Sequence, residues 1–183
     1  MSELRATYRR KLHERAFERY GYFTTKDAAE LAVPLIALGM VLRRGGLTHI
    51  SYGLYRFDDV PVTGREAYME AVLRVGEDAF LMADAVLALH DLALVNPTRL
   101  RVGTSRRSRP RVPRTIQIVR TDISPQDLTV YESIPSTTVA RALTDSLGIV
   151  MTERLVAAAN EAAERGLLRR GEVAGVLEQL EKK

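Results

Sequence analysis

Several basic and hydroxyl side chains gather between positions 24 and 56, at places where side chains could hold phosphate groups. Thr24 and Lys26 stand where a helix is expected to begin, and the free backbone N–H groups of a helix start suit an anion. Arg43 and Arg44 precede a double glycine, which is typical of a helix end. The set expected to contact DNA is Thr24, Thr25, Lys26, Arg43, Arg44, His49, Tyr52 and Arg56.

Each of these side chains also has a purely structural interpretation. Thr24 would then only cap its helix, Arg43 and Arg44 would only bind backbone carbonyls, and Tyr52 would only turn the chain. Residues 31–57 contain no Asp or Glu, and such a block indicates a polyanionic partner. The group as a whole therefore favours nucleic acid.

A second basic segment, TSRRSRPRVPR at residues 104–114, lies inside another acid-free window, residues 92–121, which holds eight arginines. One interpretation is a solvated loop between two strands. The other is a second contact surface for DNA or for an acidic or RNA-like partner, because so dense a set of arginines with interleaved prolines repels itself and does not pack. On the second interpretation Arg106, Arg107 and Arg109 join the candidate DNA contacts.

Composition excludes several classes of protein. The 183 residues carry a net charge of +4, with 46% hydrophobic and 27% charged residues, which is typical of a folded protein. Residues 1–120 hold 20 Lys and Arg against 13 Asp and Glu, whereas residues 121–183 hold 7 against 10. The absence of cysteine excludes a disulfide scaffold, a thiol nucleophile and a thiolate zinc site. A charged beginning and the lack of a long apolar run predict a cytoplasmic protein with no membrane partner.

We expect no catalytic residue, no metal site and no cofactor. A metal-dependent nuclease needs clustered carboxylates beside a lysine, but the chain has only four lysines and no such cluster. The segment GTSRR at residue 103 lacks the lysine of a phosphate-binding loop. Asp84, His90 and Asp91 do not suit acid–base chemistry, because adjacent helical residues point about 100° apart. An enzyme is therefore disfavoured.

The elements that must position the first basic segment are three helices and a hairpin. Periodicity predicts helices over residues 4–20, 25–33 and 34–44, with a short extended stretch before the second, where Thr24 and Asp27 resemble a capping box. Leu47–Ile50 and Leu54–Phe57 read as the arms of a hairpin. Three helices followed by a hairpin predict an N-terminal winged helix-turn-helix domain over residues 1–62.

Residues 63–183 predict a larger α+β domain that ends in helices. A polar junction over residues 58–63 marks the boundary, and a helix then follows to residue 75. Further helices are expected over residues 82–90, 137–147, 152–165 and 171–180, and strands over residues 100–104, 115–120 and 128–131. The predicted fold class is α+β, with a winged helix-turn-helix followed by a mixed α/β domain.

Four segments in this order carry a family resemblance: GYFTTKDAAELAV, LRRGGLTHISYGLYRF, ADAVLALHDLALVNPTRLRVGTSRRSRP and IPSTTVARALTDSL. Together the chain resembles the AbiEi-type antitoxins of bacterial abortive-infection systems, which are type IV-like toxin–antitoxin systems of phage defence. The resemblance implies a transcriptional autorepressor that binds operator DNA of its own operon through the winged helix. It also implies a C-terminal antitoxin domain that counteracts a nucleotidyltransferase-like toxin, and it is compatible with a dimer or cooperative assembly on DNA.

The expected third helix departs from the family pattern, because it reads PLIALGMVLRR where relatives carry polar and basic residues. If Leu35, Leu38 and Leu42 face the core, the opposite stripe is mainly apolar, and hydrogen-bonded reading of bases would be poor. The alternative function is therefore a winged helix that docks on another protein without sequence-specific DNA binding. Salt dependence of binding separates the two.

Overall fold

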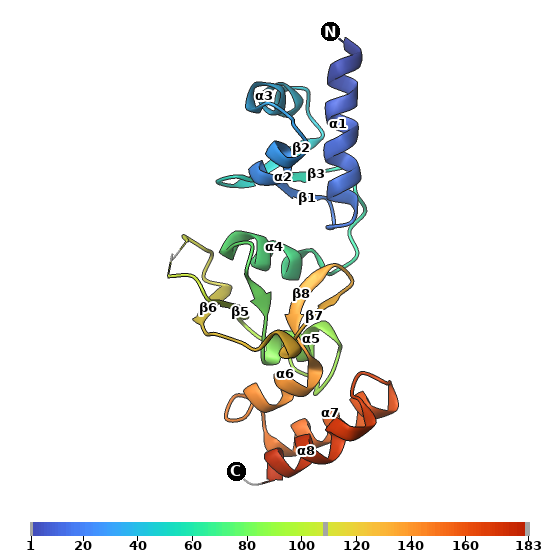
Figure 1. The fold of residues 1–183 in the computed structure, drawn as a ribbon, viewed down its shortest axis with the longest axis vertical. Helices are drawn as coiled ribbons and strands as arrows, with labels where there is room; N and C mark the ends of the chain where they lie inside the picture. Colours follow the sequence, from blue (N-terminus) through green and yellow to red (C-terminus); the bar gives the residue numbers. More distant parts are fainter. Residues whose placement is uncertain (1, 108–109, 182–183) are drawn as a thin grey trace. The chain divides into compact units, whose positions relative to one another are not determined.

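The computed structural model describes residues 2–107 and 110–181, with the side chains of the first helix described from residue 8. Over these residues the chain forms eight α-helices and two β-sheets, so the predicted α+β class is confirmed. It divides into two compact units, Met1–Arg74 and Val75–Lys183 (Figure 1). Within the described residues, no helix combines the length and the apolar character needed to cross a membrane.

The first unit begins with three helices that pack on one another. They are α1 (Ser2–Phe17), α2 (Thr25–Glu30) and α3 (Leu35–Arg43), and the short strand β1 (Tyr22–Thr24) lies between the first two. The helices share one core with the strands that follow, because Leu12, Leu38 and Phe57 are each almost fully buried in the same cluster. The periodicity of the sequence located all three helices within a few residues.

A three-stranded antiparallel sheet completes the first unit. The hairpin strands β2 (Leu47–Ser51) and β3 (Leu54–Phe57) pair with each other, and β1 pairs with the free edge of β3, which gives the order β1-β3-β2. The turn between the hairpin strands places Gly53 at a φ of +70°, a conformation that favours glycine. The hairpin turn therefore lies at the end of strands that are held by backbone pairing on both sides of β3.

Helix α4 (Glu66–Val75) extends the first unit beyond the boundary expected at residue 62. The Tyr22 hydroxyl donates a 2.8 Å hydrogen bond to Glu70, and Arg74 donates both to Glu70 at 2.7 Å and to the Ile50 carbonyl at 3.2 Å. The helix begins after Thr63, whose backbone N–H donates a 2.6 Å hydrogen bond to the Glu66 carboxylate. These side-chain contacts between distant residues place α4 with the preceding sheet.

The Tyr22–Glu70 hydrogen bond leads to a prediction about stability. We expect Tyr22→Phe to lower the free energy of unfolding by about 1.5 kcal/mol, because the half-buried carboxylate loses a donor. Burial and the Glu70 carboxylate raise the pKa of Tyr22. The contribution of the neutral phenol is therefore complete below the ordinary tyrosine pKa of about 10 and is lost as the pH rises from there through the raised value.

Urea denaturation at neutral pH and above pH 10 measures this difference. Tyr52→Phe is the control, since the Tyr52 side chain is fully exposed and we expect no change in stability. Equal stability of the wild type and Tyr22→Phe at neutral pH would show that the hydrogen bond contributes nothing.

The second unit is built on a five-stranded mixed sheet. Its strands are β4 (Phe80–Leu81), β5 (Leu100–Thr104), β6 (Ile116–Arg120), β7 (Leu128–Tyr131) and β8 (Ile134–Thr137), in the order β6-β5-β4-β8-β7. Parallel pairs join β5 to β6 and β4 to β8, whereas β4–β5 and β7–β8 are antiparallel. Three of these strands were predicted, and the central β4 and its neighbour β8 were not.

Four helices complete the second unit: α5 (Asp84–Leu89), α6 (Val139–Asp145), α7 (Thr152–Glu164) and α8 (Arg170–Glu181). A single 3₁₀ turn, η1 (Pro125–Asp127), precedes β7. α5 contacts β5 and α6, and α6 contacts both C-terminal helices. All four helices were expected from the sequence, and Thr138 caps α6 by accepting a hydrogen bond from the Arg141 backbone N–H.

Candidate nucleic-acid interface

The start of α2 is held by one buried carboxylate, that of Asp27. It accepts a 2.8 Å hydrogen bond from the backbone N–H of Thr24 and a 2.7 Å hydrogen bond from the Thr24 hydroxyl. The guanidinium groups of Arg15 and Arg19 each donate to the same carboxylate at 3.1 Å. Asp27 therefore joins α1 to α2 as well as capping α2, and only its cap with Thr24 was predicted.

This arrangement decides what the three candidates at the helix start can contact. The Thr24 hydroxyl is engaged within the protein, so its predicted role as a cap is confirmed. Thr25 is half-buried, and its backbone N–H donates to the Gly53 carbonyl of the hairpin turn at 2.9 Å. Lys26 is exposed and lies 3.9 Å from Glu30 in its own helix. Of these three, Lys26 presents the charge to solvent.

Arg43 and Arg44, at the end of α3, are exposed, and within the described residues neither side chain forms a hydrogen bond or ion pair. The loop that follows them, which begins at Gly45, is held by a residue of α1. Arg9 of α1 donates to the Gly45 carbonyl at 3.5 Å, and its guanidinium lies 5.0 Å from the centre of the Phe57 ring. A separate arginine thus fixes the helix end, and Arg43 and Arg44 remain available to an external anion.

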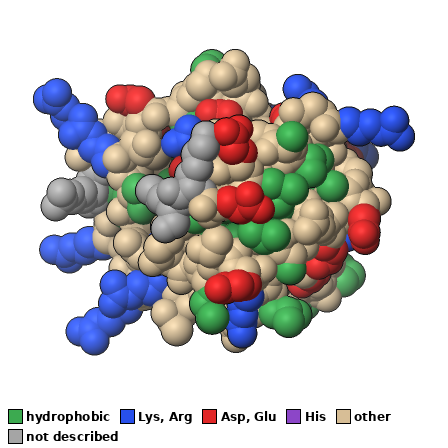
Figure 2. Space-filling view, turned by 90° about the horizontal axis from the view of Figure 1, so that it is seen from below, with side chains coloured by type: hydrophobic (Ala, Val, Ile, Leu, Met, Phe, Trp, Pro, Cys, Tyr) green, Lys and Arg blue, Asp and Glu red, His purple; other side chains and the backbone are tan. Residues whose placement is uncertain are grey.

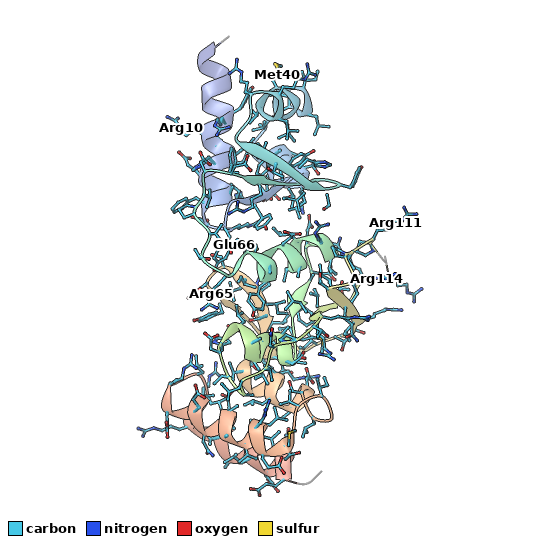
Figure 3. The ribbon with its side chains drawn as sticks, turned by 180° about the vertical axis from the view of Figure 1, so that it is seen from behind. Arg10, Met40, Arg65, Glu66, Arg111 and Arg114 are labelled. Carbon is cyan, nitrogen blue, oxygen red and sulfur yellow. The ribbon has the colours of Figure 1, made fainter. Side chains whose placement is uncertain are left out.

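Helix α3 buries Ala37, Leu38 and Val41 and exposes its apolar first turn. The exposed fractions are 68% for Leu35 and 77% for Ile36. The expectation that Leu35 faces the core was wrong, because the helix is rotated so that Leu38 and Val41 face inward. Figure 3 shows Met40 on the side of α3 that points away from the sheet of the first unit. An apolar face followed by two free cations is therefore open to solvent.

The hairpin carries the remaining candidates of the first unit. Tyr52 is fully exposed at the turn, and His49 is exposed on β2 with its ring 5.0 Å from that of Tyr55. Arg56 differs, because it donates to the backbone carbonyls of Tyr20 at 3.2 Å and Val60 at 3.0 Å. These hydrogen bonds give Arg56 a structural role, so we remove it from the proposed contact set.

The arginine-rich segment between β5 and β6 is only partly free. Arg106 lies 3.0 Å from Asp78, a carboxylate that also accepts hydrogen bonds from Thr104 and Ser105. Burial alone would raise the pKa of Asp78, but these hydrogen bonds outweigh it and lower the pKa, so the carboxylate is charged beside Arg106. Arg106 therefore has a partner within the protein.

The other arginines of this segment have different surroundings. Arg107, Arg111 and Arg114 are exposed, and none of them pairs with an acidic residue in the described part of the chain. Figure 3 shows Arg111 and Arg114 projecting outward from the loop. Arg109 lies outside the described residues. Within this segment, Arg107, Arg111 and Arg114 are therefore available to an external anion, whereas Arg106 is not.

Several charged side chains in the rest of the second unit have partners within the protein. Asp84 is buried and pairs with Arg101, and His90 ends α5 with its ring 4.1 Å from that of Tyr131. A cleft of about 420 Å³ lies between α6 and α8. Its arginine, Arg141, pairs with Asp145 at 2.9 Å and with Asp127 at 3.1 Å. The cleft therefore offers no unpaired arginine to an anion.

Acidic side chains are frequent at the end of the second unit that carries α7 and α8. Figure 2 shows hydrophobic and acidic side chains together on this face, with Lys and Arg mostly at its margin. No group of three His, Cys, Asp or Glu side chains suited to a metal ion occurs in residues 2–107 and 110–181. This face is therefore less suited to a polyanion than α3 and the hairpin are.

The candidate interface is thus defined by Lys26, Leu35, Ile36, Arg43, Arg44, His49 and Tyr52, which we call the α3–hairpin face. The sequence predicted the polar members of this set as contacts, placed Leu35 in the core, and described the opposite stripe of the helix, which includes Ile36, only as mainly apolar. It did not identify Arg9, Arg15 and Arg19, since their structural roles depend on contacts with residues distant along the chain. Comparison with models of known protein families and with curated proteins finds no match to this chain.

Proposed function

We propose that the first unit is a winged helix-turn-helix that binds double-stranded DNA through the α3–hairpin face. α2 and α3 would form the helix-turn-helix, with α3 in the major groove and the hairpin turn as the wing on the backbone or minor groove. The observation that carries this proposal is the pair Arg43 and Arg44. Both are exposed without a partner in the described residues, while the neighbouring helix end is already held by Arg9.

Charge around this face supports the same partner. Residues 31–57, which include α3 and the hairpin, contain no Asp or Glu, so a phosphate backbone would meet no repulsive side chain within this segment. Tyr52 presents an aromatic ring at the turn, and Lys26 presents a cation at the start of α2. Several side chains of this face could therefore contact phosphate groups and position the protein on DNA.

We propose further that the protein is a cytoplasmic autorepressor and antitoxin, following its resemblance to AbiEi-type antitoxins. The first unit would bind the operator of its own operon, with copies paired on inverted repeats, and the second unit would counteract a nucleotidyltransferase-like toxin without itself being an enzyme. The acidic and apolar face at α7 and α8 is suited to a protein partner rather than to a phosphate backbone. We assign no individual toxin contact.

The test of DNA binding uses the duplex immediately upstream of the gene and fluorescence anisotropy between about 50 and 200 mM salt. We expect the Arg43→Ala/Arg44→Ala variant to bind more weakly, with a salt slope lower by about 0.9 for each phosphate that the protein no longer neutralises. The control Arg154→Ala/Arg165→Ala removes the same charge from two exposed positions, one in α7 and one at its C-cap, and should change neither quantity. Equal binding by both variants would contradict the proposal.

A second candidate function has one observation in its favour, the exposure of Leu35 and Ile36. An exposed apolar helix face is what docking on another protein would need. Protein docking would depend weakly on salt, whereas a DNA contact that neutralises several phosphates depends on it steeply. The same titration therefore separates the two functions.

A further inference from the structure

We infer that the α3–hairpin face selects DNA by the C5-methyl groups of thymine rather than by hydrogen bonds to base edges. This inference rests on the proposed DNA binding and names the kind of duplex that the face prefers. Thymine presents its methyl group in the major groove, and apolar side chains contact it there. The preferred site would be rich in thymine on the strand that the first turn of α3 meets.

The residues at the start of α3 carry the argument. A recognition helix meets base edges mainly with its N-terminal residues, and in α3 these are Leu35 and Ile36. Their exposed fractions of 68% and 77% leave apolar atoms in water in the free protein. Neither side chain can donate or accept a hydrogen bond, so contact with methyl groups is the base-specific chemistry open to them.

The length of helix between the apolar first turn and the two arginines is similar to the width of the DNA major groove. Ile36 and Arg44 are eight residues apart, which corresponds to about 12 Å along a helix axis. The major groove of B-form DNA is about 12 Å wide. When Ile36 lies against the bases, Arg43 and Arg44 at the other end of the helix can therefore reach the phosphates that border the groove.

Charge identifies DNA rather than a protein as the occupant of this apolar face. An apolar partner helix would gain little from two unpaired arginines at the end of α3, whereas a phosphate backbone gains an ion pair from each. Gly39 lies between the two groups, and a Cβ atom added there would meet nothing within 4 Å. At Gly39 the helix therefore presents backbone without a side chain, beside the outward-pointing Met40 (Figure 3).

The experiment compares two probes that differ only in the methyl group: an alternating dA·dT duplex and the same duplex with deoxyuridine in place of thymidine. We expect the full chain to bind the thymidine duplex more tightly, by about fourfold for each methyl group that becomes buried. A dG·dC duplex in which cytosine is replaced by 5-methylcytosine should likewise bind more tightly than its unmethylated counterpart. The variant Leu35→Ala/Ile36→Ala should lose the preference and keep the salt slope.

Val62→Ala is the matched control, because Val62 is an apolar residue of the same unit with an exposed fraction of 76% and lies outside α3. It should keep the full preference for thymidine. Salt-dependent binding with equal affinity for both duplexes, or a preference that survives Leu35→Ala/Ile36→Ala, would overturn methyl recognition and leave the proposed DNA binding standing. Absence of salt-dependent binding to every duplex would overturn both.

Discussion

Replacement of Asp27 by alanine is expected to lower the free energy of unfolding of the first unit by about 3–5 kcal/mol. The Asp27 side chain is only 5% exposed and accepts hydrogen bonds from Arg15, Arg19 and Thr24. Its removal would leave two partly buried guanidinium groups without their shared counter-charge and would remove the cap of α2. The expected loss is a large share of the stability of a small unit.

Hydrogen exchange of the backbone amides in residues 1–74, measured on the full chain, assigns this loss to the first unit. Glu30→Ala is the matched control: Glu30 also pairs with Arg15, at 3.4 Å, but its side chain is 48% exposed, so we expect a loss below about 1 kcal/mol. Asp27→Asn keeps an oxygen that can accept from the Thr24 N–H and should fall between the two. A loss for Asp27→Ala no larger than that for Glu30→Ala would contradict the central role of this carboxylate.

The contacts of Asp27 show which interactions could be predicted from the sequence and which could not. The Thr24–Asp27 cap was predictable because both partners lie within one helical turn. The contacts from Arg15 and Arg19 were not, since they join residues 12 and 8 positions apart across two elements. Local periodicity places a helix, but it does not state which side chains of one helix reach the next.

The strands follow the same rule. The hairpin over residues 47–57 was predictable from alternating residues and a glycine turn. β4 consists of only Phe80 and Leu81, which is too short for an alternating pattern, and β8 contains Pro135. β4 exists because of its neighbours: it pairs with β5 on one side and with β8 on the other, and pairing over so long a separation in sequence leaves no local signal. β8 pairs mainly with the adjacent β7 in a short hairpin, and its proline hid that strand from a reading of the sequence.

The candidate interface was predictable as a region but not residue by residue. An acid-free segment with arginines pointed to α3 and the hairpin, and the structure exposes Arg43 and Arg44 at the end of α3 and Tyr52 at the hairpin turn. Sequence alone did not separate Arg56, whose donors are used by the carbonyls of Tyr20 and Val60, from Arg43 and Arg44, which have no partner in the described residues. All three arginines carry the same charge, and the neighbouring groups in the fold decide which of them can bind an external anion.

In the second unit, Gly103→Ala is expected to lower the free energy of unfolding by about 1–3 kcal/mol. Gly103 of β5 pairs directly with Phe80 of β4, and a Cβ atom added at Gly103 would lie 2.5 Å from Cζ of the Phe80 ring. Phe80 is only 4% exposed, so the ring has little room to move away. The glycine is therefore required by the close approach of a buried aromatic ring, since its backbone does not adopt a positive φ.

A control and a rescue make this expectation specific. Gly175→Ala in α8 introduces the same methyl group where nothing lies within 4 Å, so we expect no loss and a gain of about 0.5–1 kcal/mol. Phe80→Leu should cost less in the Gly103→Ala background than in the wild type, because the smaller side chain relieves the overlap. Urea denaturation of the four proteins of this cycle gives the coupling energy, and additive losses would show that the ring and the glycine act independently. Because β4 pairs with both β5 and β8, a coupling of this sign would show that the Phe80 ring excludes a larger side chain at Gly103 in the centre of the five-stranded sheet.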